Sequence, residues 1–101
     1  MNDFINTLRG LIARADQLDD LRFRMSLEEA VKSAPGEATP LLPGLISSKK
    51  LSVRTRQNII RCVGYLQFPS LLIPLKKIID NDQNILLKKE AVIAVSKFND
   101  Q

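Results

Sequence analysis

Few residues in this 101-residue chain could do chemistry, and their types exclude most catalytic and metal sites. The sequence has no histidine and no tryptophan, and Cys62 is its only cysteine. Triads with an imidazole base, zinc sites of cysteine and histidine, and a disulfide framework are therefore excluded. We expect Cys62 to be a small packing residue, with a reactive thiol beside Arg61 as the less favoured alternative. We predict no enzymatic activity, no cofactor and no metal for this chain alone.

Carboxylates that are close in sequence occur at Asp19–Asp20, Glu28–Glu29 and Asp80–Asp82. Adjacent residues on a helix point in different directions, so the first two pairs form no shared acid–base site. The third pair flanks a turn, where Asp82 is expected to cap the following helix. These carboxylates therefore predict local structure and no catalysis.

The formal charge of +4 is unevenly distributed along the chain. Residues 1–46 carry five basic and seven acidic side chains, whereas residues 47–101 carry ten basic and four acidic ones. No acid occurs between Glu37 and Asp80, and this stretch contains a basic band from Lys49 to Lys77. The members of the band are Lys49, Lys50, Arg54, Arg56, Arg61, Lys76 and Lys77. Such a field can steer an acidic protein or a nucleic acid, or it can serve only as a solvated surface.

The elements that must position these residues are predicted to be six short helices. Breaks are expected at Ala34-Pro35-Gly36, Phe68-Pro69-Ser70 and Asp80-Asn81-Asp82, and apolar residues between breaks recur at helical spacing. The second apolar stripe is Leu21, Met25, Leu27, Ala30, Val31 and Ala34, and the sixth is Ile85, Ala91, Val92, Ala94, Val95 and Phe98. Isolated helices of this length are marginal in water, so they must pack on one another.

An internal repeat predicts how the helices pack. Shifting the chain by 32 residues aligns small residues with one another and valines with one another. The aligned sets are Ala30, Cys62 and Ala94, then Val31, Val63 and Val95. Small residues at one position allow two helix axes to approach closely. We therefore predict a single all-α domain over residues 1–101, an α-solenoid of about three antiparallel helix pairs at residues 3–34, 38–66 and 69–98.

The helix pairs resemble HEAT-type repeats, in particular the short HEAT-like units of phycobilisome lyase-type proteins. The residues that carry the resemblance are Leu72-Ile73-Pro74-Leu75, Asp80, Val53-Arg54, Cys62, Val63 and Gly64. The resemblance covers roughly residues 3–98. It implies a ladder between a turn aspartate and an arginine six residues later, a spacing that Asp16 and Arg22 show. Arg54 is expected to reach Asp16 or Asp80 on a neighbouring repeat.

The second helix of each pair is expected to line a concave, partner-binding face. The predicted partner-binding residues follow a spacing of three to four and mix cationic, aromatic and apolar types. They are Arg22, Met25, Arg54, Gln57, Arg61, Tyr65, Leu86, Lys89, Ile93 and Lys97. We therefore predict a non-catalytic adaptor or scaffold that binds a peptide or an acidic protein surface.

Two alternatives stay open. The basic band could bind nucleic acid, although only Tyr65 and Phe68 could stack on bases, and a HEAT-like lyase accessory subunit is possible by analogy. No apolar stretch approaches the length of a membrane span and no secretory signal is present, so we expect a cytoplasmic protein without a membrane partner. Neither end of the array is heavily polar, so an uncapped end could be closed by a homodimer or by another protein.

Overall fold

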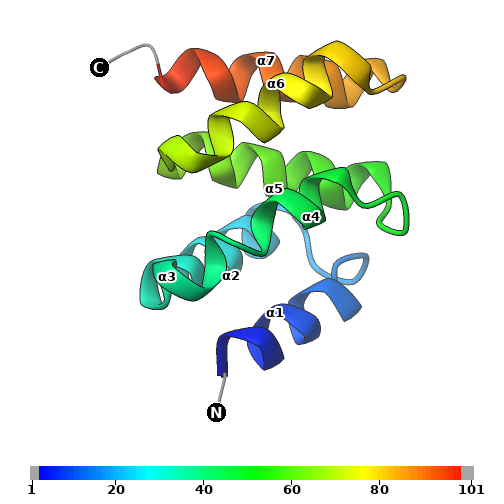
Figure 1. Ribbon diagram of the computed structural model, residues 1–101. Helices are drawn as coiled ribbons and strands as arrows, with labels where there is room; N and C mark the ends of the chain where they lie inside the picture. Colours follow the sequence, from blue (N-terminus) through cyan, green and yellow to red (C-terminus); the bar gives the residue numbers. More distant parts are fainter. Residues whose placement is uncertain (1–2, 99–101) are drawn as a thin grey trace.

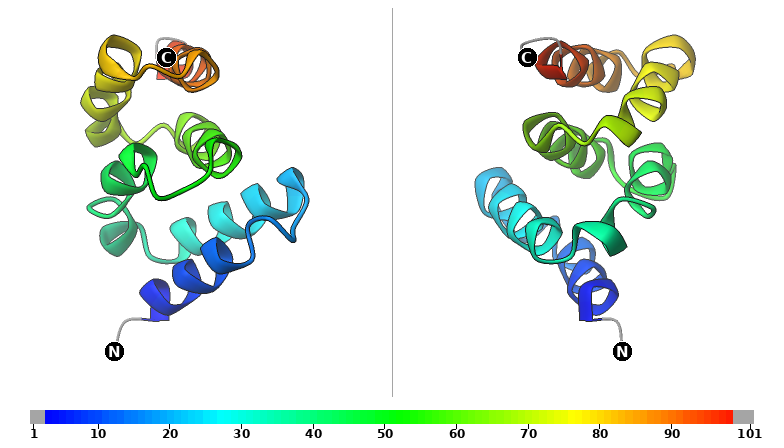
Figure 2. Two further views of the ribbon diagram at one scale, coloured as in Figure 1. Left: turned by 90° about the vertical axis from the view of Figure 1, so that its right-hand side faces the viewer. Right: turned by 60° about the vertical axis from the view of Figure 1, so that its left-hand side comes forward.

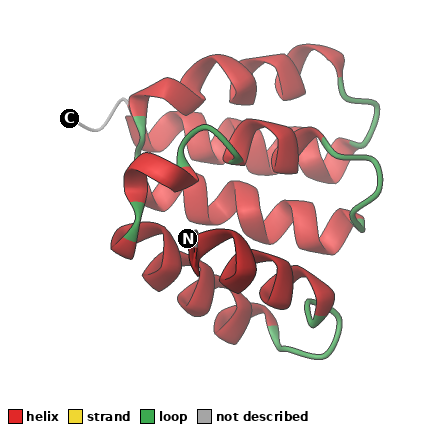
Figure 3. Cartoon of the chain, turned by 60° about the horizontal axis from the view of Figure 1, so that its bottom comes forward, coloured by secondary structure: helices red, strands yellow, loops and turns green. Residues whose placement is uncertain are grey.

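The computed structural model describes residues 3–98, and they form seven α-helices and one short 3₁₀ helix (Figure 1). The first pair of helices is α1 (Asp3–Ala13) and α2 (Asp20–Ser33). The following elements are α3 (Pro35–Ala38), α4 (Leu42–Ser47), α5 (Val53–Leu66), η1 (Pro69–Leu71), α6 (Leu72–Asn81) and α7 (Ile85–Phe98). No strand occurs over this range, as Figure 3 shows, so the expected all-α class is confirmed.

The long helices form a row. Helix α5 packs between α2 and α7, while α6 packs on α7, α4 on α5 and α1 on α2. Figure 2 shows α2, α5 and α7 along one side of the molecule and α3, α4 and α6 along the other. Helix α1 lies beyond α2 at the end of this arrangement (Figures 1 and 2).

The prediction of six helices was wrong because the first helix of the second pair is interrupted. Pro40 has no N–H group to donate, and α3 ends at Ala38, two residues before it. Pro43 then lies in the first turn of α4, where its missing donor has no cost. The predicted break at Ala34 is confirmed, because α2 ends at Ser33 and Pro35 begins α3.

Polar side chains fix where the long helices begin. Asp19 caps α2 by accepting a hydrogen bond from the Arg22 N–H, and Ser52 caps α5 in the same way through the Thr55 N–H. Helix α7 is preceded by Asn84, whose side-chain oxygen accepts from the N–H groups of Leu86 and Leu87 at 2.9 and 3.2 Å. The prediction that Asp82 caps this helix was therefore wrong.

The core is a continuous apolar layer between the two rows of helices. Its fully buried members include Phe23, Leu27, Val31, Ile59, Ile60, Val63, Leu71, Leu75 and Leu87. Two of the predicted apolar stripes are corrected, because Leu21 and Met25 of α2 and Ile85 and Val92 of α7 are more than half exposed. Phe23 and Leu87 occupy the core positions instead.

The repeat positions are buried to different degrees in the three copies. Val31 and Val63 are fully buried, whereas Val95 is only partly buried. Cys62 and Ala94 are buried, and Ala30 is partly buried. The two residues that are less buried, Ala30 and Val95, lie on α2 and α7, the first and last second helices of the row.

The described helices are short. The longest, α2, α5 and α7, have 14 residues each. Within residues 3–98, no helix has the length and apolar character required to cross a lipid bilayer.

Candidate functional site

A groove crosses the exposed side of the α2, α5 and α7 row. It has a volume of about 480 Å³, and we call it the side groove. It is lined by Leu21, Arg24, Met25, Glu28, Arg61, Cys62, Tyr65, Glu90, Ile93 and Lys97. Every lining residue belongs to one of these three helices, so the packing of all three pairs is required to form it.

Several large apolar side chains that line the side groove are exposed to solvent. Leu21 and Met25 of α2 are each 59% exposed, Tyr65 of α5 is 65% exposed and Ile93 of α7 is 52% exposed. Single exposed apolar residues are ordinary on protein surfaces, but a group of them around one depression is typical of an interaction site. Tyrosine and methionine are also among the residue types enriched at protein interfaces.

Arg61 forms the central polar contact of the groove. Its guanidinium group donates to both carboxylate oxygens of Glu90, with Nε 3.3 Å from Oε2 and Nη2 on Oε1. The Glu90 side chain is only 8% exposed, whereas that of Arg61 is 43% exposed. Hydrogen bonding to Glu90 raises the pKa of Arg61. Arg61 therefore contributes less free positive charge to the groove than the absence of acids around it in the sequence suggests.

Glu90 was missed as a site residue, although the repeat contains a signal for it. The 32-residue shift aligns Glu90 with Asn58, and both are buried. Asn58 donates to Asp20 Oδ1 of α2, and Glu90 accepts from Arg61 of α5. In both repeats, the polar residue at this position therefore forms a hydrogen bond with the second helix of the preceding pair: Asn58 of α5 with α2, and Glu90 of α7 with α5.

Cys62 lies at the floor of the groove and is 4% exposed. Burial raises the pKa of its thiol to about 12, so the thiolate is scarce at neutral pH. The predicted packing role is confirmed by this burial. Its position beside Arg61 does not produce an activated nucleophile.

The structure brings five of the ten predicted partner-binding residues together in the groove and leaves five outside it. Those inside are Met25, Arg61, Tyr65, Ile93 and Lys97, and those outside are Arg22, Arg54, Gln57, Leu86 and Lys89. Arg22 forms an ion pair with Asp19 at the start of α2. Gln57 is partly buried, while Leu86 and Lys89 are exposed on α7.

Arg54 links two repeats, but the acid in the prediction was wrong. Its Nε donates to Asp20 Oδ1 at 2.7 Å, rather than to Asp16 or Asp80, and its Nη2 donates to the Leu18 carbonyl. The hydrogen bonds from Asn58 and Arg54 hold the pKa of Asp20 below its ordinary value. The residues 14–19 form a turn that places Asp20, the first residue of α2, beside Arg54.

A second inter-repeat ion pair is buried. Arg56 donates from Nε to the Ile46 carbonyl at 2.9 Å and from Nη2 to Asp82 Oδ2 at 2.8 Å. Burial of the Asp82 carboxylate opposes ionisation, but hydrogen bonds from the Asn84 N–H and from Arg56 outweigh it and lower the pKa of Asp82. Asp82 thus joins the turn before α7 to α5.

The described residues offer no metal centre. Across residues 3–98, no three histidine, cysteine, aspartate or glutamate side chains are grouped closely enough to hold a metal ion. Comparison with protein-family models, with curated proteins and with solved structures gives no match for this chain. The resemblance to HEAT-type repeats therefore stays a prediction, and the function must be argued from the groove.

Proposed function

We propose that the protein is a non-catalytic protein-interaction module, an adaptor or scaffold, that binds a partner peptide in the side groove. The three helix pairs are then successive HEAT-like repeats of a short α-solenoid, with the second helices forming the binding face. A cytoplasmic location is part of the same proposal. The observation that carries it is the group of half-exposed apolar side chains around one groove, in particular Met25, Tyr65 and Ile93.

The charges at the groove favour an acidic partner. Two of its acids are already neutralised, because Glu90 is paired with Arg61 and Glu28 with Lys32 at 2.8 Å. Arg24 and Lys97 form no ion pair within residues 3–98. The partner that fits best is therefore a segment with apolar side chains for the groove and acidic residues beside them.

Nucleic-acid binding through the basic band has less support. Three arginines of the band are occupied by carboxylates, since Arg54 is paired with Asp20, Arg56 with Asp82 and Arg61 with Glu90. The exposed lysines that remain provide phosphate contacts but no base recognition. Nucleic-acid binding predicts an affinity that falls steeply with salt, because many phosphate contacts are lost, whereas the affinity of a peptide anchored by apolar groove residues should fall much less.

The test is selection from a random peptide display library, followed by affinity measurements on the selected peptides. The double variant Tyr65→Ala/Ile93→Ala should raise the Kd about tenfold or more, because exposed aromatic and apolar anchors dominate such interfaces. Ile73→Ala is the matched control, since Ile73 is 68% exposed on α6 and does not line the groove.

The control variant should bind the selected peptides like the wild type, and circular dichroism should show that all three proteins keep their helices. The selected peptides should be enriched in apolar and acidic residues. Failure of the wild type to retain more peptide than the double variant would contradict the proposed function.

A further inference from the structure

The outer face of α5 shows what a second helix needs in order to receive the next helix pair. Its residues Arg56, Ile60, Val63 and Gly64 are all buried, and the two apolar ones are fully so. A Cβ atom on Gly64 would lie 2.7 Å from both Cα and Cβ of Ala94, so α5 and α7 meet at that point with no room for a side chain. Arg56 reaches Asp82, in the turn that precedes α7.

Helix α7 carries the same residue types 32 positions later, but they are less covered than in α5: two of the four are exposed and two are partly buried. The aligned residues are Lys88, Val92, Val95 and Ser96: a cation, two valines and a small residue. Val92 is 51% exposed, and Ile85 on the same helix is 64% exposed. An amphipathic surface helix has a polar outer side, whereas the outer side of α7 presents Ile85 and Val92 to solvent beside its lysines. The outer face of α7 therefore has the composition of a face that receives another helix.

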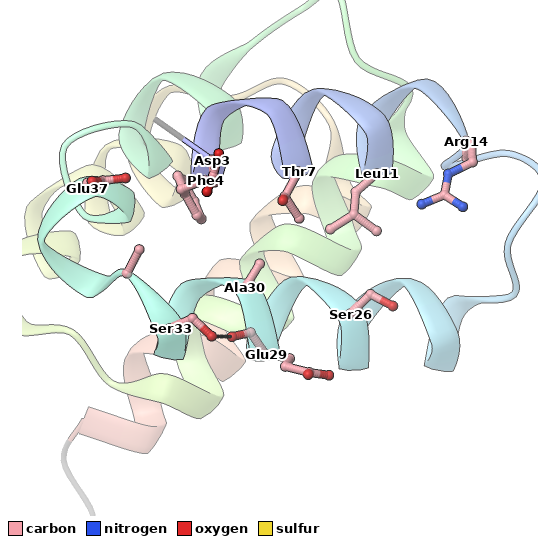
Figure 4. A pocket seen from close by; sticks show the side chains of 11 residues that line it. Asp3, Phe4, Thr7, Leu11, Arg14, Ser26, Glu29, Ala30, Ser33 and Glu37 are labelled. Atoms are coloured by element: carbon pink, nitrogen blue, oxygen red, sulfur yellow. Dashed lines mark hydrogen bonds between the residues drawn. The ribbon is translucent and has the colours of Figure 1, made fainter. Parts of the chain in front are cut away.

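The opposite end of the row is α2, where the position aligned with Asn58 and Glu90 has no preceding second helix to contact. Asn58 and Glu90 face the preceding second helix and are buried, and the aligned residue of α2 is Ser26, which is exposed. Ser26 and the small residue Ala30 line a groove of about 580 Å³ between α1 and α2, which we call the end groove (Figure 4). Thr7 and Ser33 add short side chains to its lining, so a helix could approach closely.

The two ends have opposite charge. The end groove contains the carboxylates of Asp3, Glu29 and Glu37, and Figure 4 shows Arg14, its one cation, at the far end from Asp3 and Glu37. The outer side of α7 carries Lys88 and Lys89, for which no ion pair occurs within residues 3–98. The only acid of α7, Glu90, is buried against Arg61.

These charges select one mode of self-association. Two α7 faces brought together would oppose lysine to lysine, and two end grooves would oppose carboxylate to carboxylate. Docking of α7 on the end groove pairs the opposite charges and places the small residues of α2 against a helix. A heterologous contact of this kind leaves one free face of each type and can repeat.

We propose that the outer face of α7 in one copy docks on the end groove between α1 and α2 of a second copy, so that the row of second helices continues head to tail. The contact is independent of the side groove, which no residue of the proposed contact lines. Lys88 and Lys89 provide the positive charge, Asp3, Glu29 and Glu37 the negative charge, and Val92 the apolar centre.

The first measurement is sedimentation velocity of the full chain over a range of concentrations up to millimolar, at low and at high salt. The average mass should rise above the monomer mass of 11.4 kDa with concentration, and salt should reduce it because exposed charges are screened. A chain that stays monomeric at every concentration at low salt would overturn the proposal. A discrete dimer that does not grow further would also overturn it.

Charge reversal then tests which faces meet. The variants Lys88→Glu/Lys89→Glu and Glu29→Lys/Glu37→Lys should each weaken self-association about tenfold or more, because each places like charges across the contact. An equimolar mixture of the two should associate again, since every contact between unlike molecules pairs opposite charges. Lys49→Glu/Lys50→Glu is the matched control, with the same change of charge in the turn before α5, and it should associate like the wild type.

Two results would exclude the assigned faces. One is an equimolar mixture of the two charge-reversal variants whose average mass is no higher than that of either variant alone. The other is an equal effect of the control variant, which would show that net charge alone governs association. Circular dichroism on each variant checks that the substitutions, which are placed on exposed or partly exposed residues, leave the helices intact.

Discussion

The two sides of α5 are joined to their neighbours in different ways. Toward α7, Gly64 lies against Ala94 with no room for a side chain, and the Arg56–Asp82 pair at the base of α7 is largely buried. Toward α2, the polar link is Asp20, which accepts from Arg54 and Asn58. Asp20 and Arg54 are each about half exposed, at 51% and 49%. Buried charge and a close backbone contact join α5 to α7, whereas the polar link between α5 and α2 includes an ion pair that water reaches.

This difference indicates that the molecule is not equally stable throughout. Exposed polar contacts and few covering elements favour local opening, while close-packed interfaces open only with the whole fold. We therefore expect α1 and α2 to open before α5, α6 and α7. The predictions below test the difference, from the largest effect to the smallest.

The largest effect is expected from Asp82→Ala. The substitution removes the carboxylate partner of the buried Arg56 guanidinium and the acceptor of the Asn84 N–H. Unfolding free energy should fall by about 2–3 kcal/mol, because a buried charge loses its partner. Urea denaturation measures the change. Asp80→Ala is the control, since Asp80 is exposed in the same helix-ending segment, and a loss as large as that of Asp82→Ala would remove the buried pair from the explanation.

The next effect is expected from Gly64→Ala. A methyl group there would overlap Ala94, so α5 and α7 would have to separate, at a cost of about 1–3 kcal/mol. Gly44→Ala is the matched control, because a Cβ atom on Gly44 has no neighbour within 4 Å. The control should be neutral or slightly stabilising, since alanine favours a helix more than glycine does. Thermal unfolding of both variants gives the result, and a stabilised Gly64→Ala protein would contradict the close approach.

Acidification should weaken the fold through both carboxylates whose pKa is lowered. Because the pKa of Asp82 and of Asp20 is lower in the folded chain, their contribution is present above the unfolded value of about 4 and is lost as pH falls through the folded pKa. Urea midpoints measured from neutral pH down into this range should show the loss. The Asp82→Ala protein should lose less stability on acidification than the wild type, and an unchanged slope would contradict this assignment.

The smallest effect is expected from Asp20→Ala. An exposed ion pair contributes little and is screened by salt, so the melting temperature should fall by a few degrees at most, and less at high salt. Hydrogen exchange should detect the change more clearly, as faster exchange in α2 with little change in α7. Uniformly faster exchange throughout the molecule would contradict the expected difference in stability between the α2–α5 contact and the α5–α7 contact.

Much of the fold could be predicted because the relevant signals are local. The expected breaks at Pro35 and Pro69 are confirmed, because a new helical element begins at each of them, and the 32-residue repeat correctly identified Val31, Val63 and Cys62 as buried. The short helix α3 was missed, because its four residues lie at the predicted break and contain one buried apolar residue, Ala38, which is too little for a periodic pattern. Leu21 and Met25 were assigned to a core stripe since apolar character alone does not distinguish a core from an exposed groove.

The pairing of charges could not be predicted from spacing. Arg54 bonds Asp20 rather than Asp16 because the turn before α2 brings Asp20 closer, which is a property of the tertiary arrangement. Arg61 was predicted to bind a partner, but it is already paired with Glu90 of the following helix. Only the alignment of Glu90 with Asn58 contained a hint of this bond. A sequence without homologous comparison shows which residues are charged and leaves their partners to the fold.

The single cysteine gives the molecule a built-in reporter. Cys62 of α5 lines the side groove, and its thiol is protonated and almost fully buried. A thiol reagent such as iodoacetamide can therefore react only when the helices on either side separate. The rate of alkylation would measure how often that happens, with no label added to the protein. A ligand that occupies the side groove would slow the reaction, so the same residue would report occupancy in a sample where the ligand itself carries no signal.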